Sequence, residues 1–327
     1  MKAFVKTDVL KVGQRHFPSI GILVSLAIIM IIFGIITPKF FKLDTLAGIL
    51  TITAELAVVC VPMALLLISG ELDLSVGSNF AFAGVLGALL LNRQVNGLLT
   101  LVAVILFGIL IGIINGLLTT KLRLPSFIVT LGSMFTLRGL LLVVTGGFPI
   151  SFRGQNVLLW LLNGKLIGEI RMSFIWLVFV VVCFHFILNK TRHGNWSLGC
   201  GGNADVAQAL GIPVSRVKLF NFLLVGAMAA FGGMLSFARF GMAYPTLGEG
   251  MELEAIASAV LGGCALTGGF GTIFGASLGA LLIASLRVGL VLVGAPAYWY
   301  RAFIGIILII GIVINKEVMR RLVGGGQ

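Results

Sequence analysis

Two carboxylates and a hydroxyl lie within five residues of each other, in the stretch "SGELDLSVGS" at 69–78. They are Glu71, Asp73 and Ser75, and they follow a long apolar run. Asp73 can cap a helix that begins at Leu74, because its side chain accepts a hydrogen bond from a free backbone amide. The alternative is that these residues form a charged gate or a contact for a second protein. No nucleophile accompanies them, so acid–base catalysis is not indicated.

A third carboxylate, Glu55, is the only one well inside an apolar run. A charge in such a run is costly and usually faces the interior of a helix bundle. Two interpretations stay open. Glu55 lies on the path of an ion or solute, or it forms a buried ion pair with Arg138 or Arg301. We favour the ion pair.

No catalytic, cofactor or metal site is predicted. The four cysteines have no C-x-x-C spacing, and the three histidines are scattered along the chain. The pair Gly269 and Gly271 follows no strand pattern and precedes no Gly-Lys-Ser/Thr, so it matches neither a dinucleotide nor a phosphate-loop fingerprint. If the protein's function is powered by ATP, another chain must bind the nucleotide.

The elements that position these residues are membrane helices. Of 327 residues, 59% are hydrophobic and 10% charged, whereas about a quarter of a soluble domain is charged. A membrane helix needs about 20 mostly apolar residues. Such runs occur near 20–36, 46–68, 74–91, 98–118, 126–144, 172–189, 217–238, 251–264, 270–292 and 299–315. We predict an all-α polytopic membrane protein with about ten spans in a single domain, residues 1–327, in which the eighth span is too short to cross comfortably.

The basic residues indicate how the chain is oriented. With ten spans both termini share one side, and that side carries thirteen Lys and Arg residues against seven on the other. The excess predicts cytoplasmic termini and accounts for the net charge of +12, so nucleic-acid binding is not indicated. The longest cytoplasmic loop is then 189–216, and the longest external loop is 145–171.

A polar island, "GGNADVAQALGIPVSRVK" at 201–218, lies in the cytoplasmic loop. Asn203 suits an N-cap, and Asp205 suits the first turn of a helix over Ala204–Leu210. Gly211 suits the left-handed position after a helix, and Pro213 prevents continuation. Seven residues are too few for a stable isolated helix, so the helix must dock on something. The candidate contact residues are Asn203, Ala204, Asp205, Ala207, Gln208, Ala209, Gly211 and Ile212.

Two further patterns concern the packing of the spans. "ELDLSVGS" at 71–78 opens the third span and "ELEAIASAVLGG" at 252–263 opens the eighth, from opposite sides of the membrane, as in the inverted repeats of transporters. Gly271, Gly275 and Gly279 have the spacing of small residues that allow membrane helices to approach closely.

Four blocks resemble one known family in the right order along nearly the whole chain. They are "LLISGELDLSVGS", "LRLPSFIVTLGSMFTLRGL" (122–140), the polar island and "GEGMELEAIASAVLGGCALTGGFGTIFG". The sequence resembles the membrane permease subunits of bacterial ABC importers for monosaccharides of the ribose, xylose, arabinose and galactoside group. It departs from that pattern at Glu71, where the family usually has Gly.

The resemblance implies a function for the polar island. Residues Asn203–Gly211 would be a coupling helix that sits in a groove of a separate ATPase subunit, which binds ATP and Mg²⁺. A soluble sugar-binding protein would dock on the external loops 145–171 and 239–250. A second permease copy or a paralogue would complete the pore in the bacterial inner membrane.

Two other functions are weighed against this one. An ion-gradient-driven transporter of a small polar solute would use Glu55 and Asp73. A lipid-modifying membrane enzyme is disfavoured, because no His, Asp and Ser set occurs at a membrane interface.

Overall fold

The computed structural model describes residues 21–296, 299–306 and 309. The basic residues expected at both termini and the second half of the tenth expected span lie outside the described residues. The elements, in chain order, are a helix over Gly21–Ile36, η1 (Pro38–Phe41), α2 (Leu43–Ile68), α3 (Val76–Asn92), α4 (Gly97–Thr120), α5 (Ser126–Thr145), β1 (Ile150–Ser151), α6 (Val157–Asn163), β2 (Lys165–Ile167), β3 (Ile170–Arg171), α7 (Ser173–Lys190), α8 (Arg192–Gly202), α9 (Ala204–Ala209), α10 (Val214–Phe240), β4 (Met242–Ala243), α11 (Met251–Leu261), α12 (Ile273–Leu292) and a helix over 299–306.

The helices confirm the predicted all-α polytopic membrane protein. Among the described residues, six helices are long and apolar enough to cross a membrane, namely α2, α4, α5, α7, α10 and α12. The helix over Gly21–Ile36 and α3 are apolar but shorter. α11 has only 11 residues, as expected for the span that was too short to cross. The total of ten spans and the side of the termini stay predictions.

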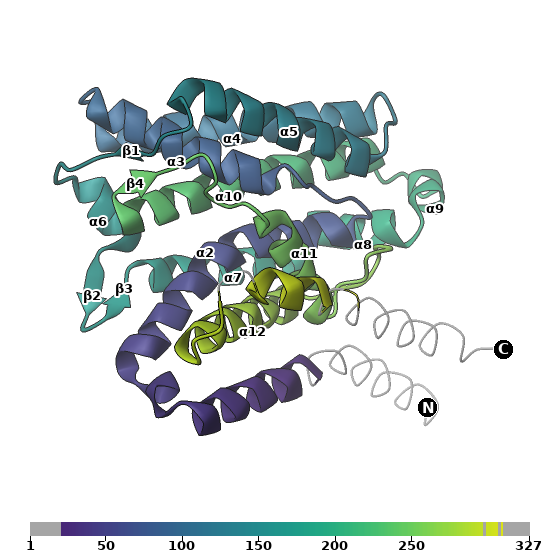
Figure 1. The fold of residues 1–327 in the computed structure, drawn as a ribbon. Coiled ribbons are helices and arrows are strands. Elements are labelled where there is room, and N and C mark those ends of the chain that lie inside the picture. Colours follow the sequence, from purple (N-terminus) through teal and green to yellow (C-terminus); the bar gives the residue numbers. More distant parts are fainter. Residues whose placement is uncertain (1–20, 297–298, 307–308, 310–327) are drawn as a thin grey trace.

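The bundle is built around α2. In its most apolar window 89% of the residues are buried, against 28% in α4 and 22% in α5 and α7. α2 contacts α7, α10, α11 and α12, so protein surrounds it on all of these sides (Figure 1). The outer helices instead expose large apolar side chains, such as Phe135 and Val143 of α5. Lipid tails are as apolar as these side chains, so this surface suits a bilayer and not water.

The two ends of the bundle differ. α8 and α9 lie at one end, and α6 with the short strands β1, β2, β3 and β4 lies at the other (Figure 1). We call these the α9 end and the sheet end. β1 pairs antiparallel with β4, with Ile150 opposite Ala243, and β2 pairs with β3. The loop 145–171, which was predicted to be external, contains a helix and three strands, and the loop 189–216, which was predicted to be cytoplasmic, contains two helices.

Two helices begin inside the bundle and run apart. α3 ends near β1, where Asn92 Nδ2 donates to Ser151 O at 3.0 Å, so it runs to the sheet end. The turn after α11 reaches the α9 end, where Gly269 N donates to Ile68 O at 2.9 Å. Their N-termini meet, because a Cβ at Gly77 would collide with the Glu252 carboxylate. The two segments of the expected inverted repeat are thus in contact and oppositely directed, an arrangement found at the centre of many transporters. The repeat itself stays a prediction.

The expected glycine-mediated packing of α12 is confirmed at two of three positions. A Cβ at Gly275 would collide with the carbonyl oxygen of Gly262, and one at Gly279 with that of Ser258, so α12 lies directly against α11 and its C-terminal turn. Gly271 precedes α12 and is not part of the helix, so its assignment to the helix contact was wrong.

Candidate functional site

The predicted short helix forms at the α9 end with both of its expected caps. Asn203 Oδ1 accepts from the backbone N of Asp205 and of Val206, each at 3.0 Å. Gly211 has a φ of 83°, the left-handed region. Ile212 N donates to Ala207 O and Gly211 N to Gln208 O, both at 3.0 Å, which is the Schellman pattern. α9 ends at Ala209, and Leu210 is its C-cap and not its last residue.

α9 presents an apolar surface to the outside of the molecule. Its side chains are exposed except that of Ala207, which is buried, and that of Ala204, which is partly buried. Val206 is 55% exposed and Leu210 is 77% exposed. The predicted contact residues Asp205, Gln208 and Ala209 are exposed beside them. An exposed apolar patch with a polar rim is typical of a protein contact.

A preceding helix, α8, carries α9 and was not predicted. Thr191 caps its N-terminus, with Oγ1 accepting from Gly194 N at 3.3 Å. His193 Nε2 and Ser197 Oγ then contact the amide group of Asn221 on α10, at 2.7 and 3.2 Å. Four glycines and low hydropathy over residues 192–202 hide this helix from an apolar-run search. The Thr191 cap is the local signal that marks its start.

Glycines from three distant segments meet behind α9. Gly70 follows α2, Gly201 and Gly202 end α8, and Gly268 and Gly269 belong to the turn between α11 and α12. We call these five residues the glycine junction. A Cβ at Gly201 would collide with Ile68 O and Gly269 N, and one at Gly268 would lie 2.8 Å from Gly201 Cα. The backbones that carry α9, α2 and α11 are therefore in direct contact.

The carboxylate of Glu71 lies beside this junction and pairs with α10. Lys218 Nζ is 2.7 Å from Glu71 Oε1, and both side chains are largely buried, with 15% and 14% exposed. The ion pair links the α2–α3 connection to the helix that follows α9. The sequence analysis identified Glu71 but not its partner, because 147 residues separate the two.

Asp73 is buried and is held by neutral groups. Its Oδ1 accepts from the N and Oγ of Ser75 at 2.7 and 2.6 Å, and its Oδ2 accepts from Asn115 Nδ2 at 3.3 Å. Ser133 Oγ in turn donates to Asn115 Oδ1 at 2.5 Å. We call these four residues the Asp73 network; it joins the start of α3 to α4 and α5. The prediction that Asp73 caps a helix beginning at Leu74 was wrong: α3 begins at Val76 with Ser75 as its N-cap and has no side-chain cap hydrogen bond, and Asp73 instead holds the turn before the helix.

The expected partners of Glu55 were wrong. Its two carboxylate oxygens are each 3.4 Å from Arg239 Nη1, so the buried ion pair exists but joins α2 to the end of α10. Arg138 Nη1 instead donates to the carbonyl oxygens of Pro245 and Leu247, the latter at 3.1 Å. Arg301 pairs with Glu249 at 3.6 Å. Among the described residues, no group of three or more His, Cys, Asp and Glu side chains is arranged to hold a metal ion.

These features define the class. A bundle of apolar helices with a buried polar interior, in which two short helices meet end to end, is the architecture of a multi-pass membrane transport permease.

Residues 45–312 match the family described as the permease component of the branched-chain amino acid transport system, and the chain belongs to this permease family. The chain is 32% identical over 314 residues to the ribose import permease protein RbsC of Escherichia coli, covering 93% of this chain and 97% of that protein. It is 36% identical over 308 residues to the probable ABC transporter permease protein YphD of the same species, covering 94% and 92%. It is 31% identical over 327 residues to the fructose import permease protein FruG of Bifidobacterium longum, covering 97% and 95%. The family resemblance predicted from the sequence is confirmed.

The charge of Asp73 can be tested separately from its hydrogen bonds to Ser75. Asparagine keeps an acceptor for Ser75 but removes the charge. We expect Asp73→Asn to insert and assemble normally while uptake falls about tenfold or more, because a hydrogen bond to a charged group is worth about 1.5–3 kcal/mol. Asp44→Asn, at an exposed position in the first turn of α2, is the matched control and should transport normally. Full uptake by Asp73→Asn would leave Asp73 only with the role of holding the turn before α3.

Proposed function

We propose that this chain is the permease subunit of an ABC importer and forms the path of a monosaccharide across the bacterial inner membrane. The observation that carries the proposal is α9, a capped and exposed helix that is joined through the glycine junction to the central helix α2. The names of the ribose and fructose import permeases support a sugar over the amino acids of the family description.

In this function α9 docks on the ATPase, and the α9 end faces the cytoplasm. Val206 and Leu210 supply the apolar contact, and the exposed polar side chains of Asn203, Asp205 and Gln208 surround it. Because the backbones at the glycine junction touch, a displacement of α9 reaches α2 and the turn after α11. The Glu71–Lys218 pair connects the same displacement to the Asp73 network, the proposed gate.

The sheet end then receives the sugar-binding protein. β1 and β4 bring the 145–171 and 239–250 segments together there, so both proposed contact segments form one surface. A second permease copy or a paralogue completes the pore, and binding of nucleotide and partner proteins selects between its inward-open and outward-open states.

ATP and Mg²⁺ belong to the ATPase in this proposal, and the permease binds no cofactor. We expect the purified chain alone in nanodiscs to show no saturable ATP binding. Together with its ATPase and binding protein in proteoliposomes, it should import a labelled monosaccharide only when ATP is enclosed on the ATPase side. Saturable ATP binding by the chain alone would contradict this assignment.

A second candidate is an ion-gradient-driven transporter of a small polar solute. The buried carboxylates of Asp73 and Glu55 favour it, because proton- or sodium-driven transport uses such groups. If ATP-free proteoliposomes take up the solute when a proton or sodium gradient is imposed, this result would support the second candidate and exclude the first.

A further inference from the structure

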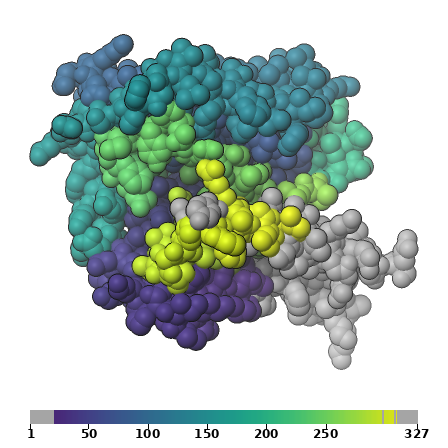
Figure 2. All heavy atoms as spheres, viewed as in Figure 1, coloured from purple at the N-terminus to yellow at the C-terminus, as the bar shows by residue number. Residues whose placement is uncertain are grey.

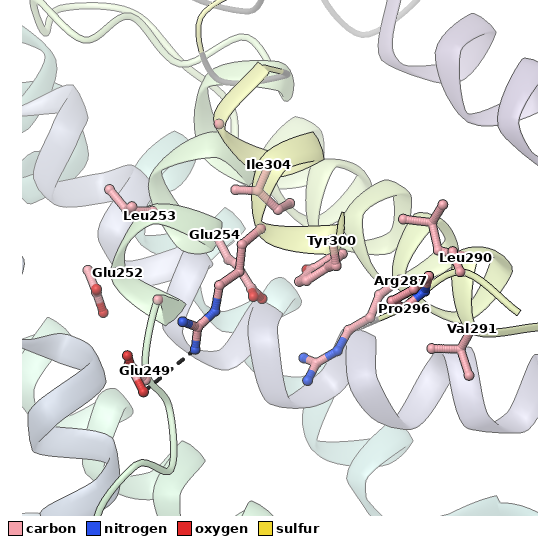
Figure 3. Close-up of a pocket in the computed structure, with 14 residues that line it drawn as sticks. Glu249, Glu252, Leu253, Glu254, Arg287, Leu290, Val291, Pro296, Tyr300 and Ile304 are labelled. Carbon is pink, nitrogen blue, oxygen red and sulfur yellow. Dashed lines mark ion pairs between the residues drawn. The ribbon is translucent and has the colours of Figure 1, made fainter. Parts of the chain in front are cut away.

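Two adjoining cavities open beside the start of α11. Their volumes are about 310 and 480 Å³, and they share Glu249, Glu254, Arg287 and Arg301 in their walls. Figure 3 shows Glu249 and Glu252 on one side of the larger cavity and Arg287 on the other, with Glu254 and Tyr300 between them. On the face shown in Figure 2, the yellow C-terminal residues lie between the purple N-terminal residues and the green residues near β4. The cavities are large enough for a small solute.

The charges in the smaller cavity balance. Three carboxylates and three guanidinium groups line it, and we call them the Glu–Arg pocket: Glu55, Glu249, Glu254, Arg239, Arg287 and Arg301. Hydroxyl groups of Ser236, Tyr244 and Thr246 also line the cavity. A wall of equal positive and negative charge favours a solute with no net charge, because the attraction and repulsion of an ion would roughly cancel and leave its loss of hydration uncompensated.

The ion pairs in this pocket are loose. Arg239–Glu55 and Arg301–Glu249 measure 3.4 and 3.6 Å, whereas the two other ion pairs in the described part of the chain both measure 2.7 Å. A direct charge-assisted hydrogen bond spans about 2.7–2.9 Å. Arg287 lies over the Tyr300 ring at 5.3 Å and forms no ion pair with a described residue. The carboxylates and guanidinium groups of the pocket can therefore form further hydrogen bonds with a ligand.

The chemistry of these groups matches a sugar. Sugar hydroxyls donate to carboxylates and accept from guanidinium groups, so one polyol can use both kinds of charged group. Phe80, Phe240 and Tyr244 line the same cavity and offer apolar faces to the C–H groups of a sugar ring. The two ion pairs lie at different depths in the pocket. The side chains of Glu55 and Arg239 are 10% and 24% exposed, so this pair is deep. Those of Glu249 and Arg301 are 52% and 70% exposed, so this pair lies at the rim.

We propose that the Glu–Arg pocket is where this permease holds an uncharged monosaccharide during transport. The proposal rests on the proposed function and adds to it the residues that contact the solute. Glu254 and Arg287 are central, because each lines both cavities and they come from different helices, α11 and α12. The turn after α11 is part of the glycine junction, so a movement there that shifts α11 would also shift Glu254 in the pocket.

Photolabelling tests the position of the solute. The complete transporter with its ATPase and binding protein is illuminated with a diazirine derivative of ribose, and the labelled peptides are identified by mass spectrometry. We expect labels within 249–254 and next to Arg287, removed by excess ribose and not by excess leucine. Labels confined to other segments would overturn the proposal. So would labelling of this pocket by diazirine leucine, with competition by leucine alone, because the ligand would then be an amino acid.

Two variants test the residues. We expect Glu254→Gln and Arg287→Gln to reduce labelling about tenfold and to keep binding the ATPase in a pull-down. Asp44→Asn and Arg93→Gln, both exposed and outside the pocket, are the matched controls and should label normally. Normal labelling of both pocket variants would also overturn the proposal. If either variant fails to assemble, the labelled positions in the unaltered protein still decide.

The outcomes separate the two proposals. If the unaltered transporter imports no sugar with ATP, the proposed function fails. If it imports sugar while the pocket stays unlabelled, only the assignment of the pocket fails.

Discussion

Gly201→Ala is expected to abolish uptake, although it adds a single methyl group. The new Cβ would collide with the backbone atoms Ile68 O and Gly269 N. Backbone atoms cannot move to another rotamer, so α8 would have to shift away from the end of α2 and from the turn after α11. Overpacking of this kind costs typically about 1–3 kcal/mol, and we place this site at the upper end of that range. Uptake of labelled sugar and the thermal unfolding temperature in detergent are the measurements.

The neighbouring glycine is the control for this prediction. A Cβ at Gly202 would meet nothing within 4 Å. Gly202→Ala should therefore keep normal uptake and thermal stability, while Gly201→Ala loses both. Normal uptake and stability of both variants would show that close backbone contact at the junction is not required. A stable but inactive Gly201→Ala protein would be the most informative result, since it would separate the transmission of movement from folding.

The sequence predicted the features that depend on residues close together in the chain. The caps of α9 at Asn203 and Gly211 are local, because each acts on amide or carbonyl groups two to five residues away. The short length of α11 was also visible, because an apolar run limits the length of a membrane helix. Glu55 was recognised as buried for the same reason: it is a carboxylate within an apolar run.

The pairings could not be predicted, because they depend on how distant segments fold together. Glu55 and Arg239 are 184 residues apart, and several arginines were equally possible partners. The glycine junction brings together glycines from three segments of the chain, and none of these segments has a sequence pattern that predicts the contact. Asn115 did carry a signal that was missed, since it is the only asparagine within α4 and a polar side chain in an apolar helix needs a partner. α8 was missed because glycine and polar residues give no apolar run.

Gly211→Val is expected to lower uptake strongly while leaving the membrane bundle intact. Gly211 is exposed and has a φ of 83°, and a Cβ there would meet nothing within 4 Å. The substitution therefore acts through the backbone alone. A left-handed conformation costs an ordinary residue about 1–2 kcal/mol, and a β-branched residue is among the least tolerant. α9 would lose the Schellman hydrogen bonds of Gly211 and Ile212, and the direction in which the chain enters α10 would change.

Asparagine at the same position provides the control, because it enters the left-handed region more readily than other side chains. We expect Gly211→Asn to keep most of the uptake and Gly211→Val to lose it, with both proteins equally abundant in the membrane. A pull-down with the ATPase then decides how α9 acts. If Gly211→Val no longer retains the ATPase, α9 is the docking element. If it retains the ATPase but ATP hydrolysis no longer responds to sugar and binding protein, α9 docks by its exposed side chains and transmits movement through its C-terminal cap. If Gly211→Val imports sugar as well as Gly211→Asn, the coupling role proposed for α9 is wrong, because that role requires the C-terminal cap formed by Gly211 and Ile212.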